Sequence, residues 1–166
     1  MTQNGMEWNN PGNIPVRVSH IRGEIARDGV EAEYLFDNAE RLGSGLLARD
    51  LAYLGRYKWF RTLDLGCRAM FLILYNFSEL YEDNTVIGLI SRWCTMSGRE
   101  NVLPIGDYAK AVAKRLGRTI TGSVDTSDPE DMKQLICSIS RIECGEEPDK
   151  ETLDEAWNIF NAGARF

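Results

Sequence analysis

The sequence predicts an all-α protein, a compact helical domain with one central buried helix and an irregular N-terminal strap. Seven segments place apolar residues three or four positions apart, as on one face of a helix. No series of segments shows the alternation that is typical of strands. With 166 residues, of which 43% are hydrophobic, the chain is long enough to bury one core, so we expect a single domain over 1–166.

The N-terminal segment 1–25 is rich in Asn, Pro and Gly around Trp8 and Ile14. This composition predicts an extended or turning strap, with at most a short strand and no helix. Two helices are then expected over 30–42 and 44–54, where apolar residues return to helical spacing and a glycine follows each run.

The most apolar segment, 63–81, begins at Thr62 or Asp64, either of which can cap a helix. Its apolar side chains surround almost the whole helix, which is typical of a helix buried on most sides. We therefore expect this helix to be the central element of the core.

Four more helices are expected after it. We predict Asp83 or Asn84 as the N-cap of the first and Asp107 as the N-cap of the second. Residues 127–130 form the pattern of a capping box with proline at the first helical position. The four predicted helices cover residues 85–94, 108–116, 129–143 and 150–161.

The charge and the apolar runs exclude several classes of protein. The net charge is −6 and the basic residues are scattered among acids, so nucleic acid is not an expected partner. The longest apolar run, 69–75, is far shorter than a membrane span. No cationic stretch precedes an apolar core at the N-terminus, so we expect a soluble chain without a signal peptide.

The residues that bind metals or cofactors are sparse. Four cysteines form no CxxC pair and share the chain with one histidine, His20, so we expect reduced thiols and no metal site. The sequence has no nucleotide-binding glycine loop, no HExxH and no Gly-x-Ser-x-Gly motif, and it predicts no cofactor.

Five short motifs occur in order along the chain. They are Trp8-Asn9-Asn10-Pro11-Gly12-Asn13-Ile14, Gly66-Cys67-Arg68-Ala69-Met70, Ile90-Ser91-Arg92-Trp93, Glu100-Asn101 ahead of Tyr108, and Glu143-Cys144-Gly145. Together they resemble the lysozyme-like or lytic transglycosylase domains that degrade the cell wall in bacteriophage virions. The resemblance implies a lysozyme-like fold, with 26–57 as an inserted helical pair.

Glycosidic cleavage requires a carboxylic acid that stays protonated near neutral pH, which favours a partly desolvated Glu at the edge of an apolar groove. Glu143 fits best, because it ends an amphipathic helix just before Cys144-Gly145. The other reading of Glu143 is a solvated residue at a helix end. Glu24 is the next candidate acid, followed by Glu7 and Glu100.

Several side chains could bind the sugar. Asn9, Asn10 and Asn13 could hydrogen-bond N-acetyl groups or hydroxyls, or could instead form Asx turns around the proline and glycine. Trp8 and Trp59 could stack on sugar rings. By contrast, the helical patterns around Trp93 and Trp157 predict core positions, and Arg68 and Arg92 are expected to hold the strap.

The resemblance and these residues favour cleavage of peptidoglycan or another N-acetylated glycan, with Glu143 as general acid. The alternative is a phage structural or adaptor protein that keeps the lysozyme-like fold without catalysis and contacts virion proteins. The acidic charge and the acidic lead-in Asn4-Gly5-Met6-Glu7, where the family has a basic one, favour this alternative. Either protein would act in the virion or in the bacterial cytoplasm before release.

Overall fold

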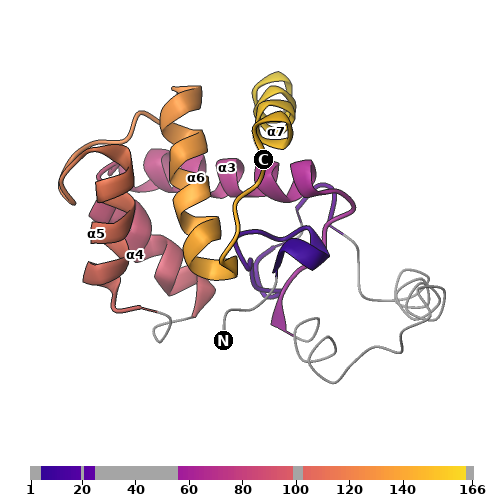
Figure 1. The fold of residues 1–166 in the computed structure, drawn as a ribbon, viewed down its shortest axis with the longest axis horizontal. Coiled ribbons are helices and arrows are strands. Elements are labelled where there is room, and N and C mark those ends of the chain that lie inside the picture. The colour runs from indigo at the N-terminus through magenta and orange to yellow at the C-terminus, as the bar shows by residue number, and fades with distance from the viewer. Residues whose placement is uncertain (1–4, 20, 25–55, 99–102, 164–166) are drawn as a thin grey trace.

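The computed structural model describes residues 5–19, 21–24, 56–98 and 103–163. Within these ranges the protein is helical, with five α-helices, a short 3₁₀ helix and no named strand (Figure 1). The prediction of an all-α fold is confirmed. The two helices predicted over 30–42 and 44–54 lie outside the described residues.

Helix α3 (Leu63–Tyr81) is the central element, and its bounds match the predicted ones. The side chain of Thr62 caps it by accepting a hydrogen bond from the amide of Leu65. It packs against α7, α4 and α6, and Figure 1 shows α6 crossing in front of it. The run from Gly66 to Leu74 is buried throughout, as expected, whereas Leu80 and Tyr81 at the other end are exposed.

Helices α4 (Val86–Ser97) and α5 (Ile105–Leu116) follow, each longer than predicted. The N-cap of α4 is Thr85 rather than Asp83 or Asn84, because the Thr85 hydroxyl accepts from the amide of Gly88. The first turn of α5 begins at Pro104, so Asp107 lies inside the helix and does not cap it. Helix α4 thus has a local side-chain cap at a neighbour of the predicted residues, whereas α5 begins after Pro104 with no side-chain cap.

Helices α6 (Pro129–Cys144) and α7 (Lys150–Ala162) lie close to their predicted bounds. Asp128 caps α6 and places proline at the first helical position, as expected. Ser127 does not complete a capping box, because its hydroxyl bonds to Asp125. Trp157 on α7 and Trp93 on α4 are buried, which confirms their core assignment.

The N-terminal strap begins with the 3₁₀ helix η1 (Gly5–Trp8), which the sequence did not predict. Beyond it the strap runs alongside residues 56–60 and is joined to them by antiparallel bridges, Pro15 with Tyr57 and Glu24 with Phe60. Tyr57 was predicted as the last residue of the inserted pair. In the structure it belongs to this backbone pairing.

Two glycines let the strap approach the helices closely. A Cβ added at Gly66, in the first turn of α3, would lie 1.8 Å from the carbonyl oxygen of Asn9, and a Cβ at Gly12 would lie 2.7 Å from the ring of Trp93. Asn9 and Asn13 have positive φ angles of 56° and 49°, a conformation that Asn tolerates better than most residues. The strap therefore packs on α3 and α4 through backbone, as predicted.

The two arginines expected to hold the strap differ in burial and in the groups that they contact. Arg68 is 1% exposed, and its pKa is lowered by burial and by the nearby charge of Arg22. Arg92 instead pairs with Asp83 at the corner between α3 and α4, so its predicted role was wrong. The strap residue Arg17 provides the link to α4, because it donates to the carbonyls of Thr95 and Met96 at the helix C-terminus.

Replacing Leu72 with alanine tests the central position of α3. Leu72 is 5% exposed, so we expect Leu72→Ala to lower the free energy of unfolding by roughly 2–5 kcal/mol through lost contacts and a residual cavity. Leu80→Ala, at a 74% exposed position on the same helix, is the control and should change it by less than about 0.5 kcal/mol. Equal losses of unfolding free energy in Leu72→Ala and Leu80→Ala, measured in denaturant melts, would contradict the central position of α3.

Replacing Gly66 with alanine tests the docking of the strap. The added methyl group collides with the Asn9 carbonyl, so the strap must move, and we expect faster amide hydrogen exchange at Ile14 and Lys58. Gly106→Ala is the matched control, because nothing lies within 4 Å of a Cβ there. It should stabilise α5 slightly, by up to about 1 kcal/mol. Wild-type rates of amide exchange at Ile14 and Lys58 in Gly66→Ala would contradict the close packing of the strap on α3.

Candidate active site

The carboxyl group of Glu143 lies inside the protein at the C-terminal end of α6. Glu143 follows Ile136 and Ile139 by seven and four positions and therefore lies on the same inward stripe of the helix. Its exposure is 1%, so it is not the solvated helix-end residue that the sequence left open. Cys144 is the last residue of the helix, and Gly145, in the left-handed conformation, caps it.

Two other segments donate hydrogen bonds to Glu143. The hydroxyl of Tyr108, in the first turns of α5, donates to Oε2 over 3.1 Å. The side-chain amide of Asn13 in the strap donates to the backbone carbonyl over 3.1 Å and lies 3.5 Å from Oε1. The structure thus brings together Glu143 and one of the predicted amides, from opposite ends of the chain.

Two thiols surround this carboxyl. Cys144 donates to the carbonyl of Pro11 over 3.3 Å, which gives the strap a second contact with the end of α6. Burial raises the pKa of Cys94 to about 11, and the negative charge of Glu143 adds to the rise. Burial and the same charge also raise the pKa of Tyr108 well above its usual value. All four cysteines are buried and free, which confirms the expectation of thiols.

Asn9 and Asn10 hold the strap in place. Asn10 is fully buried, accepts from the amide of Ile14 and donates to the carbonyls of Ile14 and Lys58. Asn9 donates to the carbonyl of Phe60. In this structure both side chains serve the backbone, and of the three predicted amides only Asn13 reaches Glu143.

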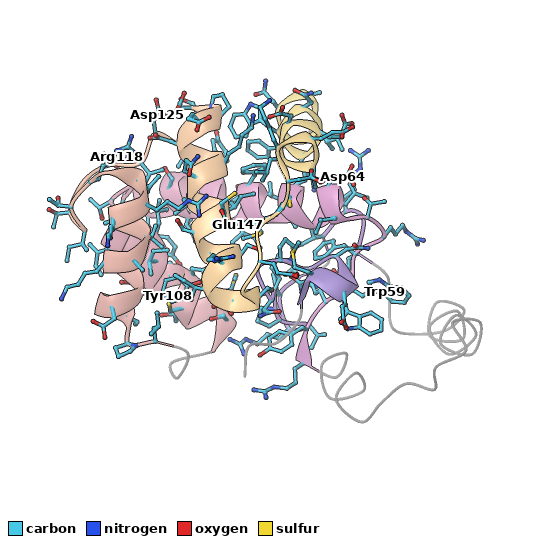
Figure 2. All side chains as sticks on the ribbon, viewed as in Figure 1. Trp59, Asp64, Tyr108, Arg118, Asp125 and Glu147 are labelled. Atoms are coloured by element: carbon cyan, nitrogen blue, oxygen red, sulfur yellow. The ribbon has the colours of Figure 1, made fainter. Side chains whose placement is uncertain are left out.

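The two tryptophans predicted to stack on sugars lie against each other. Their rings are 5.5 Å apart in an edge-to-face arrangement, and both side chains are partly exposed. Figure 2 shows Trp59 on the opposite side of the molecule from Tyr108. Trp59 therefore does not lie beside the carboxyl of Glu143. Trp8 packs against Trp59.

Glu24, the second candidate acid, forms an ion pair. Its Oε2 lies 2.6 Å from the ammonium of Lys58, and both side chains are almost buried, at 9% and 1% exposure. It also accepts from the amide of Ile21. A carboxylate joined to an ammonium is suited to holding the strap against 56–60 rather than to donating a proton. Glu7 is exposed, and Glu100 lies outside the described residues.

The strap motif contacts the motifs on α3 and α4, and two of the motifs reach Glu143. Gly12 contacts Trp93, Gly66 contacts Asn9, and Tyr108 and Asn13 bond to the acid itself. The sequence contained Tyr108 as part of a motif but gave no signal that its hydroxyl would reach Glu143. The pair 100–101 lies outside the described residues, as does His20.

Glu143 does not line either of the two hollows described next, which lie on other parts of the described surface. The larger, about 610 Å³, lies between the end of α3 and the outer face of α4. The smaller, about 190 Å³, lies between Pro15–Arg17, Arg56–Tyr57 and the end of α4. Because Glu143 is 1% exposed, the acid is covered in this conformation, and access to it requires movement of the residues that cover it.

No family model matches this sequence, and no curated protein matches it either. The likeness to phage wall-degrading domains therefore depends on the five motifs and remains a hypothesis. In the described ranges, no three His, Cys, Asp or Glu residues are grouped so that they could hold a metal ion. No helix there is long and apolar enough to span a membrane.

The raised thiol pKa values predict a loss of stability in alkali. In the unfolded chain Cys94 ionises near pH 9, whereas in the folded protein its pKa is about 11. The unfolded state therefore releases protons first, so stability is complete below pH 9 and falls as the pH rises toward 11. We expect Cys94→Ala to flatten this fall in denaturant melts taken at pH 8 to 11. The same slope of stability against pH in Cys94→Ala and in wild type would contradict the raised pKa of Cys94.

Proposed function

We propose that this chain cleaves glycan strands of peptidoglycan or a related N-acetylated polymer, with Glu143 as the general acid. The observation that carries the proposal is the buried carboxyl at the end of α6, held by Tyr108 and Asn13 where the motifs meet. Both donors come from motifs that resemble those of phage wall-degrading domains.

The arrangement around Glu143 suits an acid whose orientation matters. Proton donation requires an approach of about 2.6–3.2 Å between a carboxyl oxygen and the glycosidic oxygen. Tyr108 fixes Oε2, while the contact of Asn13 with Oε1 is longer, 3.5 Å against 3.1 Å. Oε1 is therefore the oxygen more easily turned toward a substrate when the strap shifts.

The attack on the anomeric carbon uses no second carboxyl group from this chain. In the proposed reaction the glycosidic bond breaks as Glu143 protonates the leaving oxygen. The N-acetyl group of the substrate, or water, then takes the anomeric carbon, and neither route requires a second carboxylate. Glu24 is engaged with Lys58 and is not assigned a role in the reaction.

A non-catalytic phage structural or adaptor protein is the second candidate, and one observation favours it. Glu143 is 1% exposed, and both of its carboxyl oxygens face donors within the protein. A buried carboxyl bonded in this way joins α5, α6 and the strap, and this structural role needs no catalysis. The net charge of −6 also opposes contact with an anionic cell wall.

Replacing Glu143 with glutamine separates the two candidates. We expect Glu143→Gln to reduce the release of soluble fragments from purified peptidoglycan by about 10²-fold or more, because a positioned acid contributes 10²–10⁴-fold. Tyr108→Phe, which removes only the hydroxyl, should shift the pH optimum while leaving some cleavage. Products with 1,6-anhydro ends would indicate a transglycosylase.

The control for this experiment is the thermal unfolding of each variant. A variant that unfolds at the wild-type temperature but no longer cleaves supports the catalytic role. Cleavage that survives Glu143→Gln would overturn it. A wild-type protein that cleaves nothing, with a Glu143→Gln variant that unfolds at a lower temperature, would establish the structural alternative.

A further inference from the structure

The larger hollow contains a preorganised polar pair among apolar side chains. Phe77 and Tyr81 from α3, and Ile87 and Met96 from α4, form its apolar walls. Arg92 and Asp83 also line it, joined by an ion pair of 3.0 Å. Its volume of about 610 Å³ lies within the range of small-molecule sites, which are apolar hollows with a few fixed polar groups.

Arg92 is held in place from three directions. One of its terminal nitrogens, Nη1, donates to Asp83 and to the carbonyl of Gly88, each over 3.0 Å. Its guanidinium lies 4.2 Å from the centre of the Tyr81 ring. The hydrogen bonds of Arg92 within the described residues are made by Nη1. The N–H groups on Nε and Nη2 are therefore available to a ligand.

Asp83 is fixed as firmly as Arg92. Its Oδ1 accepts from the amide and the hydroxyl of Thr85, and these bonds lower the pKa of Asp83. A Cβ at Gly88 would lie 2.2 Å from Asp83, so this approach requires the glycine. The pair therefore needs no rearrangement to meet a ligand, which lowers the entropic cost of binding.

We propose that this hollow binds a neutral saccharide. The charges of Arg92 and Asp83 cancel, so the site does not select an ion, while together they offer donors and acceptors that match sugar hydroxyls and amides. The apolar walls match the C–H face of a sugar ring, and Tyr81, which is 51% exposed, provides an aromatic edge.

The saccharide site is separate from the acid. On α4, Arg92 and Ser91 line the hollow, whereas Trp93 and Cys94 are buried on the inner side near the strap and Glu143. The hollow would therefore hold a glycan strand at a distance from the reacting bond. The choice of an N-acetylated sugar as its ligand rests on the proposed function, whereas the binding of a neutral sugar rests on the hollow itself.

Titration with the tetramer of N-acetylglucosamine, followed by amide NMR shifts, tests this proposal. We expect shifts at the lining residues of α3 and α4, and at least about tenfold weaker binding by Tyr81→Ala. Arg92→Lys should also weaken binding, because lysine keeps the charge but loses the planar fork. Leu80→Ala, next to Tyr81 but outside the hollow, is the matched control and should bind like wild type.

Wild-type affinity in Tyr81→Ala, or an absence of shifts at the hollow in millimolar tetramer, would overturn the proposal. A wild-type protein that binds there but cleaves no peptidoglycan would overturn the proposed function and leave this site standing.

Discussion

The burial of one carboxyl group, that of Glu143, constrains the rest of the structure. Removing a carboxylate from water is costly unless hydrogen bonds replace those of the solvent. Tyr108 and Asn13 provide these bonds, so α5 and the strap must both reach the end of α6. The requirement ties together residues 130 positions apart. Catalysis and fold specificity are two explanations for a carboxyl group at this buried position, and they differ experimentally.

The strap can meet this requirement only because its backbone comes unusually close to the helices. Gly66 leaves room for the Asn9 carbonyl and Gly12 leaves room for Trp93. The amide of Asn10 and the Glu24–Lys58 ion pair then fasten the strap to residues 56–60. Apart from the short 3₁₀ helix η1 and a few turn hydrogen bonds, the backbone of the strap is satisfied by these tertiary partners.

Helix α4 separates the two places where the molecule could meet a ligand. Its inner side packs Trp93 toward the strap, and its outer side contributes Arg92 to the hollow. The hollow is open and polar where the pair lies, whereas the acid is covered. Under the two proposals, the hollow holds a glycan and the acid cleaves it, so binding can persist in a protein that has lost catalysis.

The sequence by itself determined the helices whose apolar spacing is long and regular, so α3, α6 and α7 lie where it placed them. It also named Glu143 as a candidate acid and the strap residue Asn13 as a candidate sugar-binding amide, and the structure joins the two. The sequence did not settle the starts of α4 and α5, since Thr85 caps α4 in place of its neighbours and α5 begins after Pro104 without a side-chain cap. The tertiary structure also decided the hydrogen-bond and ion-pair partners of Arg92, Asn10 and Glu24. Periodicity reports which face of a helix is buried, whereas the donor that a buried polar group meets depends on segments distant in the chain.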